Sequence, residues 1–285
     1  MKNLREIRER IKGIKKTQQI TKAMKMVSAV RFKKTSSKLI SNRPYADSIA
    51  NLVSDLVIRV GEKATHPFFI RNEKSNKSLL VVIGSDKGLC GSFNSNLLRY
   101  CLKYLNEKKD KEIHIITIGK KVNDYLKKRD YNIINSWLNI SFNLSYDTAS
   151  KIEEQIVGLF LKEKYKEVNI LYNEFKNAAQ TKITLKKLLP LESIEKEKNK
   201  TEFIYEPNPE EVLKELLPRF MKVIVCRILL ESNVSEQGLR MTAMEQATKN
   251  ADDMIKNLTL LYNKSRQTNI TKELADVVGG AEAVA

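Results

Sequence analysis

Hydrophobic residues at the beginning of the chain recur at alternating steps of three and four positions. The positions that follow this spacing are Leu4, Ile7, Ile11, Ile14, Gln18 and Thr21. A mean period of about 3.5 residues keeps one seam of a helix facing a partner helix, so the pattern predicts half of a coiled coil within residues 1–57. Gln18 and Thr21 should form a polar layer in this seam, and Ile20, Met24 and Val27 should continue it as a neighbouring stripe.

The end of the chain repeats the same spacing over residues 207–285. Its regular positions are Met241, Met244, Thr248, Ala251, Ile255, Leu258 and Tyr262. Pro218 suits the first position of a helix and not its interior, so we predict a short helix before Pro218 and a long one after it. From Pro218 to Val278 the long helix would span about 90 Å, too far to lie on one globule. We predict that the two terminal helices pair in an antiparallel coiled coil, because this pairing buries the apolar stripes of both helices.

Short β-branched runs alternate with helical patterns in the middle of the chain. The runs cover residues 79–84, 113–118 and 168–172, and the helical patterns cover 94–108, 120–129 and 147–164. Strands without polar alternation are typical of parallel sheets covered on both faces. We therefore expect an α/β fold class: a long antiparallel coiled coil of the N- and C-terminal helices with an inserted Rossmann-like α/β domain over residues 77–200.

The charge is concentrated in the first helix. The chain has 51 Lys and Arg against 34 Asp and Glu, a net charge of +17, and 14 of these basic residues fall within residues 1–43. Such a segment is typical of a transit peptide, of a nucleic-acid-binding arm, or of a helix that meets acidic partners. The heptad spacing argues against a cleavable leader. A basic coiled-coil nucleic-acid-binding protein and an α/β enzyme with helical arms remain alternatives.

A glycine-rich segment follows the first predicted strand and contains Gly84, Gly88 and Gly91. Gly84 and Gly88 enclose three residues, whereas a P-loop needs four followed by Lys and Ser or Thr. We interpret the segment as a structural turn. His66 and His114 lie in no catalytic pattern, and the three cysteines form no CxxC pair, so we expect no catalytic residue, no metal site and no cofactor.

Four segments resemble the γ-subunit family of F-type ATP synthases, the rotating central stalk. They are IKKTQQITKAMKMVS at Ile14–Ser28, SDKGLCGSFN at Ser85–Asn94, SEQGLRMTAMEQATKNADDMI at Ser235–Ile255, and NKSRQTNITKELADVVGGAEA at Asn263–Ala283. The resemblance implies a non-catalytic subunit that transmits torque between the membrane rotor ring and the catalytic β subunits. It implies partners in the ring of α and β subunits, the ε subunit and the c-ring, with no nucleic acid and no small-molecule substrate.

The resemblance also implies contact residues and a location. The residues expected at the β subunits are Lys22, Met24, Lys25, Arg31, Arg240, Arg266, Gln267 and Thr271. In the family, β subunits present acidic lever segments to the basic face of the shaft, and a β catch loop meets the polar residues near the C-terminus. The expected location is the cytoplasmic side of a bacterial inner membrane, as a peripheral protein.

Overall fold

The computed structural model describes residues 4–61, 66–70, 72–73, 75–108, 111–140, 144–163, 165–191 and 205–282. Its contacts divide the chain into two compact units, Met1–Ser28 with Met241–Ala285 and Ala29–Arg240. We call the first the helix-pair unit and the second the sheet unit. Helix α1 (Leu4–Val60) and helix α5 (Pro209–Glu282) contribute to both. The boundary predicted at residue 200 lies outside the described residues.

Helix α5 starts where the sequence provides a cap. The Asn208 side-chain oxygen accepts a hydrogen bond from the Glu211 amide at 2.9 Å, and Pro209 occupies the first helical position. The predicted break before Pro218 is wrong, because α5 continues through it. A proline inside a helix costs about 3 kcal/mol or more. Burial of Leu217, Phe220 and Met221 on either side of Pro218 offsets this cost.

A five-stranded sheet forms the centre of the sheet unit, in the order β3-β2-β1-β4-β5. The strands are β1 (Lys77–Ile83), β2 (Glu112–Ile118), β3 (Ile133–Trp137), β4 (Glu167–Phe175) and β5 (Thr181–Leu189). Strand β1 pairs in parallel with β2 and β4, and β2 with β3, whereas β5 runs antiparallel to β4. The predicted α/β fold class is confirmed. The two edge strands of the sheet, β3 and β5, were not predicted from the sequence.

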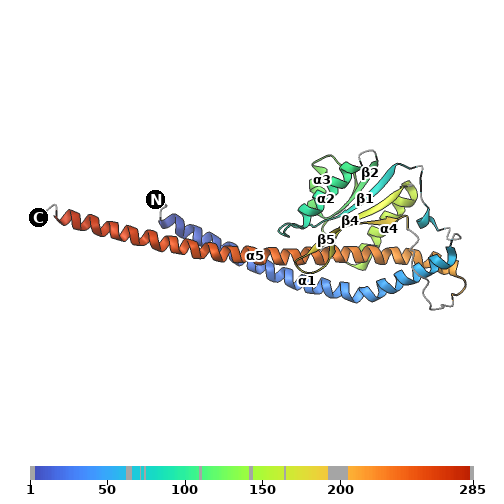
Figure 1. The fold of residues 1–285 in the computed structure, drawn as a ribbon, viewed down its shortest axis with the longest axis horizontal. Coiled ribbons are helices and arrows are strands. Elements are labelled where there is room, and N and C mark those ends of the chain that lie inside the picture. The colour runs from blue at the N-terminus through green and yellow to red at the C-terminus, as the bar shows by residue number, and fades with distance from the viewer. Residues whose placement is uncertain are drawn as a thin grey trace. The chain divides into compact units, whose positions relative to one another are not determined.

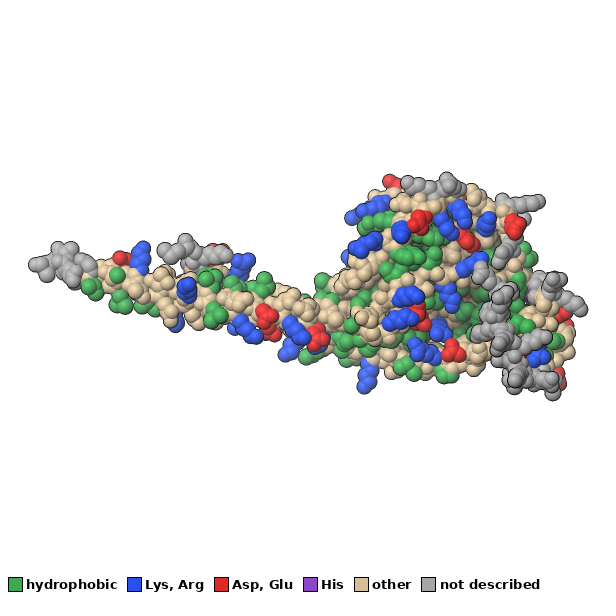
Figure 2. All heavy atoms as spheres, viewed as in Figure 1, with side chains coloured by type: hydrophobic (Ala, Val, Ile, Leu, Met, Phe, Trp, Pro, Cys, Tyr) green, Lys and Arg blue, Asp and Glu red, His purple; other side chains and the backbone are tan. Residues whose placement is uncertain are grey.

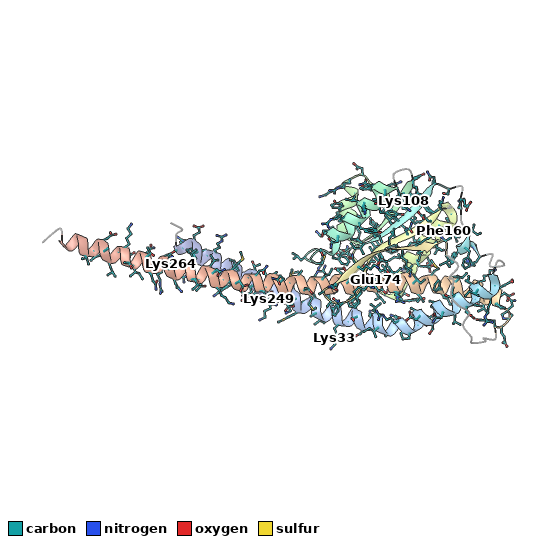
Figure 3. All side chains as sticks on the ribbon, in the orientation of Figure 1. Lys33, Lys108, Phe160, Glu174, Lys249 and Lys264 are labelled. Atoms are coloured by element: carbon teal, nitrogen blue, oxygen red, sulfur yellow. The ribbon has the colours of Figure 1, made fainter. Side chains whose placement is uncertain are left out.

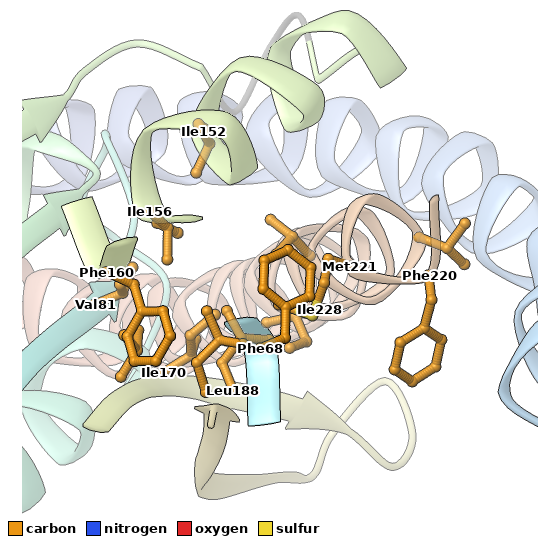
Figure 4. Packing of buried hydrophobic residues seen from close by; sticks show 14 of the residues in the cluster. Phe68, Val81, Ile152, Ile156, Phe160, Ile170, Leu188, Phe220, Met221 and Ile228 are labelled. Carbon is orange, nitrogen blue, oxygen red and sulfur yellow. The ribbon is translucent and has the colours of Figure 1, made fainter. Parts of the chain in front are cut away.

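Helices cover both faces of this sheet (Figure 1). Helix α2 (Phe93–Glu107) and helix α3 (Lys120–Lys127) pack on one face through residues such as Leu97 and Leu126. On the other face, α4 (Tyr146–Glu163) joins the segments of α1 and α5 that belong to the sheet unit. A short 3-10 helix, η2 (Pro67–Phe69), adds Phe68 to this second core. Figure 4 shows Phe68 among residues of α4, α5 and the sheet.

The helix-pair unit has the predicted seam. Every position of the two main stripes is buried or half-buried, from Leu4 to Thr21 on α1 and from Met241 to Tyr262 on α5. The prediction that a neighbouring stripe continues the seam is wrong in part, since Ile20 and Val27 are 60% and 51% exposed. A seam between only two helices is narrow, so residues beside it face solvent.

Cross-helix hydrogen bonds fix the direction of the pair. Gln18 contacts Asp252, Thr21 contacts Thr248 at 2.8 Å between hydroxyl oxygens, and Lys25 contacts Glu245 at 2.8 Å. Residue numbers rise along α1 while those of the partners fall along α5. The two helices are therefore antiparallel, as predicted, and Gln18 and Thr21 form the expected polar layer.

Candidate partner-binding surfaces

The first candidate surface lies on α1 in the helix-pair unit and carries three of the predicted contact residues. Lys22 is exposed, whereas Met24 and Lys25 are half-buried beside the seam. The Lys25 ammonium donates to Glu245, and this hydrogen bond lowers the pKa of the Glu245 carboxyl. Ile20 and Val27 are exposed beside these residues. This part of α1 thus offers an outside partner both positive charge and apolar area, which Figure 2 shows interspersed along the helices.

The second candidate surface is the last part of α5. The pairing of Thr21 with Thr248 places Ile7 opposite Tyr262, so residues after Ser265 lie beyond Leu4, the first described residue of α1. All side chains described from Arg266 onward are exposed, including Gln267 and Thr271. The Thr271 hydroxyl donates to the Gln267 carbonyl oxygen at 3.0 Å.

Large hydrophobic side chains are also exposed on this last part of α5. They are Ile270, Leu274, Val277 and Val278, with exposed fractions from 48% to 70%. A contiguous apolar surface of this kind on a helix is typical of a region that another protein covers. We call residues 266–278 the overhang.

The glycine-rich turn after β1 packs against α3 in the sheet unit. A Cβ atom on Gly84 would lie 2.1 Å from a Val122 methyl carbon, and Gly91 has a φ of +59°. Both positions therefore favour glycine, for lack of space at Gly84 and for backbone conformation at Gly91. Gly88 has more room, with Lys121 at 3.6 Å from the position of its Cβ.

Arg240 differs from the expectation that its charge is exposed to an acidic partner. Its side chain is only 8% exposed and lies 2.7 Å from the Glu236 carboxylate. The guanidinium also donates to the carbonyl oxygens of Lys87 and Gly88, at 3.0 and 3.3 Å. Arg240 thus fastens α5 to the glycine-rich turn. No local pattern predicts this burial, because a glutamate four residues before an arginine, as in Glu236 and Arg240, is also typical of an exposed helix face.

The remaining predicted contact residue, Arg31, is exposed on the part of α1 that belongs to the sheet unit. The predicted residues therefore form three groups. Lys22, Met24 and Lys25 lie together, Arg266, Gln267 and Thr271 lie on the overhang, and Arg31 and Arg240 belong to the sheet unit. Further basic side chains project from the same helices, Lys33 from α1 and Lys249 and Lys264 from α5 (Figure 3).

Cys90, Cys101 and His114 belong to residue types that can act as nucleophiles or metal ligands, and all three lie in the sheet unit. Burial raises the pKa of the Cys90 thiol and raises that of Cys101 to about 12, so neither forms a reactive thiolate near neutral pH. His114 is held between the Tyr165 hydroxyl at 2.6 Å and Glu112 at 2.9 Å. In the described part of the chain, no cluster of His, Cys, Asp or Glu could hold a metal ion.

Comparison with known proteins gives these surfaces a context. The profile of a protein family described as ATP synthase matches residues 3–284. An ATP synthase gamma chain from Halothermothrix orenii is 42% identical over 289 residues, which cover 100% of both chains. The chain belongs to the ATP synthase gamma-chain family. A gamma chain from Christiangramia forsetii is 42% identical over 287 residues, covering 100% of this chain and 99% of the relative.

Solved structures agree with this family membership. A chain of the central stalk and c-ring structure of the Tetrahymena thermophila mitochondrial ATP synthase is 31% identical, with a TM-score of 0.61. The match covers 80% of this chain and 99% of that one. A chain of the Euglena gracilis mitochondrial ATP synthase shares the fold over 99% and 94% of the two chains, with a TM-score of 0.70 and 23% identity. None of the helices described here has an apolar stretch long enough to cross a bilayer.

Proposed function

We propose that this gamma-family chain is the central-stalk rotor subunit of an F-type proton-translocating ATP synthase. It would transmit torque between a membrane rotor ring and the catalytic β subunits, so that proton flow and ATP synthesis or hydrolysis are coupled. The observation that carries the proposal is the antiparallel helix pair with its overhang. This element presents basic and apolar side chains to a surrounding partner and differs along its sides, as an asymmetric shaft must.

The asymmetry is what allows a subunit without an active site to drive chemistry elsewhere. Three identical catalytic subunits acquire different nucleotide affinities only if something contacts each of them differently. A ligand shifts a conformational equilibrium solely through its differential interaction with the two states. A rotating helix pair would change its contacts with each β subunit in turn, and would move each site through binding, reaction and release.

The contacts follow from the three groups of predicted residues. Lys22, Met24, Lys25 and Arg31 would meet the acidic levers of the β subunits. Arg266, Gln267 and Thr271 would meet a catch loop, and the apolar part of the overhang would be enclosed by the ring of α and β subunits. Arg240 would contribute from inside the chain, since it holds the glycine-rich turn in place.

The sheet unit would connect the shaft to the ε subunit and the c-ring. The chain itself would be non-catalytic and would bind neither nucleic acid nor a substrate for turnover. Its place would be at the cytoplasmic side of a bacterial inner membrane, as a peripheral subunit held by its partners.

Reconstitution with α and β subunits tests the proposal directly. With the ring fixed to a surface and an optical tag on α2, ATP hydrolysis should make the tag revolve. A tag that stays still during hydrolysis would count against a rotor role. The isolated chain should neither hydrolyse ATP nor bind duplex DNA with the steep salt dependence of phosphate contacts, and either activity would favour one of the rival classes.

Met24→Lys addresses the lever contact. Because Met24 is half-buried beside the seam, an added ammonium should still reach solvent and leave assembly intact. The same ammonium would bind the acidic lever too firmly, so the number of protons pumped per ATP hydrolysed should fall. Met26→Lys is the matched control, since Met26 is 58% exposed on the same helix. Unchanged pumping in the Met24 variant would argue against this contact.

A further inference from the structure

A pocket of about 340 Å³ lies between α1 and α5 inside the sheet unit. Helix α1 supplies Arg31, Lys34, Thr35 and Lys38, whereas α5 supplies Leu230, Asn233 and Gln237, and Leu144 precedes α4. None of these eight residues, all in the described part of the chain, is acidic. The volume falls within the range of pockets that hold small organic ligands, and the three cations favour an anionic one.

Gln237 gives a second and independent indication of a ligand. Its side chain lines the pocket although the residue is only 3% exposed, and its carboxamide oxygen is buried without a hydrogen-bond partner. Buried polar groups without partners are rare in proteins and call for an explanation such as a bound molecule. A carboxamide can present either its oxygen or its NH₂ group by rotation, so it can pair with a phosphoryl oxygen or with a donor.

The apolar wall of the pocket is fixed by the core. Leu230 is buried in a cluster with Leu39 and Val234, and Leu144 packs against the same cluster. Gly238, next to Gln237, keeps α5 close to its neighbours, because a Cβ there would lie 2.9 Å from the Ala178 carbonyl oxygen and 3.3 Å from the Phe32 ring. A wall held in this way is formed before any ligand arrives, which lowers the cost of binding.

We infer that this pocket binds a phosphorylated small molecule of nucleotide size. Its phosphoryl oxygens would lie against the cations of Arg31, Lys34 and Lys38, its organic part would cover Leu144 and Leu230, and the Gln237 carboxamide would complete its hydrogen bonds. Lysine and arginine bind phosphate oxygens through charge-assisted hydrogen bonds. This inference stands apart from the proposed function, because the chain alone should bind the ligand and should not turn it over.

Calorimetric titration of the full chain with ADP at physiological salt is the test. ADP should bind saturably at one site, and Lys34→Ala should weaken binding by about tenfold or more, the loss expected for one charge-assisted hydrogen bond. Lys33→Ala is the matched control. Lys33 is exposed, projects from the same helix (Figure 3) and does not line the pocket, so its removal changes the net charge equally and should leave ADP binding within twofold.

A second variant tests the directional contact. Gln237→Leu keeps a similar volume but removes the hydrogen-bonding groups, so ADP binding should weaken several-fold while pyrophosphate binding, which depends on the cations, changes less. Circular dichroism and thermal melting establish whether this buried variant folds. If it does not fold, the Lys33 and Lys34 comparison still decides.

Three outcomes would overturn the inference. Equal losses in the Lys33 and Lys34 variants would mean that ADP is attracted only by the overall positive charge. The absence of saturation up to about 10 mM ADP would mean that there is no site of useful affinity. Binding of a glutamate-rich peptide in a Lys34-dependent way, without binding of ADP, would show that the pocket receives an acidic protein segment instead.

Discussion

Helix α5 is buried in different ways in the two units. In the sheet unit, residues 231–238 are buried one after another, so every side of the helix is covered there. In the part of α5 that belongs to the helix-pair unit, Met244 and Ala251 are the only buried residues among the side chains described, residues 241–278. The more enclosed segment, ESNVSEQG, is also the more polar. Burial along this helix therefore depends on how many neighbours surround it and on whether they satisfy its polar groups, and not on hydrophobicity alone.

The two units also differ in the hydrogen bonds that the polar side chains of α5 make. In the sheet unit, the Ser235 hydroxyl donates to the Asn173 carbonyl oxygen at 3.1 Å, and Arg240 donates to two carbonyl oxygens of the glycine-rich turn. In the helix-pair unit, Thr21 and Thr248 bind each other at the edge of solvent. Removing a partner should therefore be costly in the sheet unit and mild in the helix-pair unit.

The largest effect is expected from Arg240→Ala. The substitution would remove the cation that faces the buried Glu236 carboxylate, together with the hydrogen bonds that Arg240 donates to the Lys87 and Gly88 carbonyl oxygens. Breaking a buried ion pair on one side costs about 3–5 kcal/mol, so the melting temperature of the sheet unit should fall by many degrees. Arg8→Ala is the control, because Arg8 is exposed on α1. Equal melting temperatures for the two variants would show that the buried pair contributes little.

The next effect is a dependence on pH that belongs to the sheet unit. Glu153 on α4 is 3% exposed, and burial raises the pKa of its carboxyl to about 7 despite the nearby Lys222 ammonium. The folded state therefore keeps a proton that the unfolded state releases above its ordinary pKa of 4.5. The free energy of unfolding should thus decrease as pH rises from about 4.5 to 7, by roughly 2 kcal/mol after allowance for solvent screening.

Urea unfolding of Glu153→Gln at pH 5 and pH 8 tests this effect. The variant should lose most of the decrease between the two pH values, because its amide does not titrate. Glu154→Gln is the matched control, because the pKa of the Glu154 carboxyl is shifted in the opposite direction. A hydrogen bond from Lys222, at 3.0 Å, lowers the pKa of the Glu154 carboxyl, so its contribution is lost as pH falls. If Glu153→Gln keeps the whole pH dependence, another group is responsible.

A smaller effect of opposite direction is expected in the helix-pair unit. Replacing both hydroxyls of the polar layer, in Thr21→Val with Thr248→Val, leaves no polar group without a partner and extends the apolar seam. Such double replacements are neutral or stabilise by about 1 kcal/mol. Hydrogen exchange of the amides of residues 14–25 should become slower or stay the same. Faster exchange would show that the threonine pair stabilises the seam.

The smallest effect is expected from Lys25→Ala. The Lys25 and Glu245 side chains are 38% and 42% exposed, and an ion pair at such a site is screened by water and salt. Hydrogen exchange around residue 25 should change slightly at low salt and not at 0.5 M salt. A large change at both salt concentrations would mean that this pair is as important as the buried pair of Arg240.

The sequence was sufficient for the repeating parts of the fold. The 3.5-residue stripes predicted both helices and their antiparallel seam, and the β-branched runs predicted the three central strands. Strand β5 was missed because Lys182, Lys186 and Lys187 break the kind of continuous apolar run on which the prediction relied, and lysines are usual in a strand at the edge of a sheet. Strand β3 was missed because Asn135 and Ser136 interrupt its apolar pattern.

Which polar residues are buried inside the sheet unit could not be predicted, because their burial depends on contacts between segments that are distant in the sequence. Arg240 meets residues more than 150 positions earlier in the chain. Gln237 and Glu153 look like ordinary surface residues in the sequence, and only the fold encloses them. Proline inside α5 was misjudged for a related reason, since the local penalty is offset by packing of neighbouring residues against the core.

The opposite directions of the two paired helices restrict how such a chain can change in length during evolution. Deleting one heptad from α1 between Ile7 and Thr21 would shift the residues before the deletion by one heptad relative to α5. Each of these residues would then face a different residue of α5. The original pairing could be restored only by also removing a heptad from the part of α5 that faces the deletion. That part lies more than 200 residues later in the chain. Insertions and deletions in these helices should therefore occur as distant pairs, whereas the turns of the sheet unit can lengthen independently.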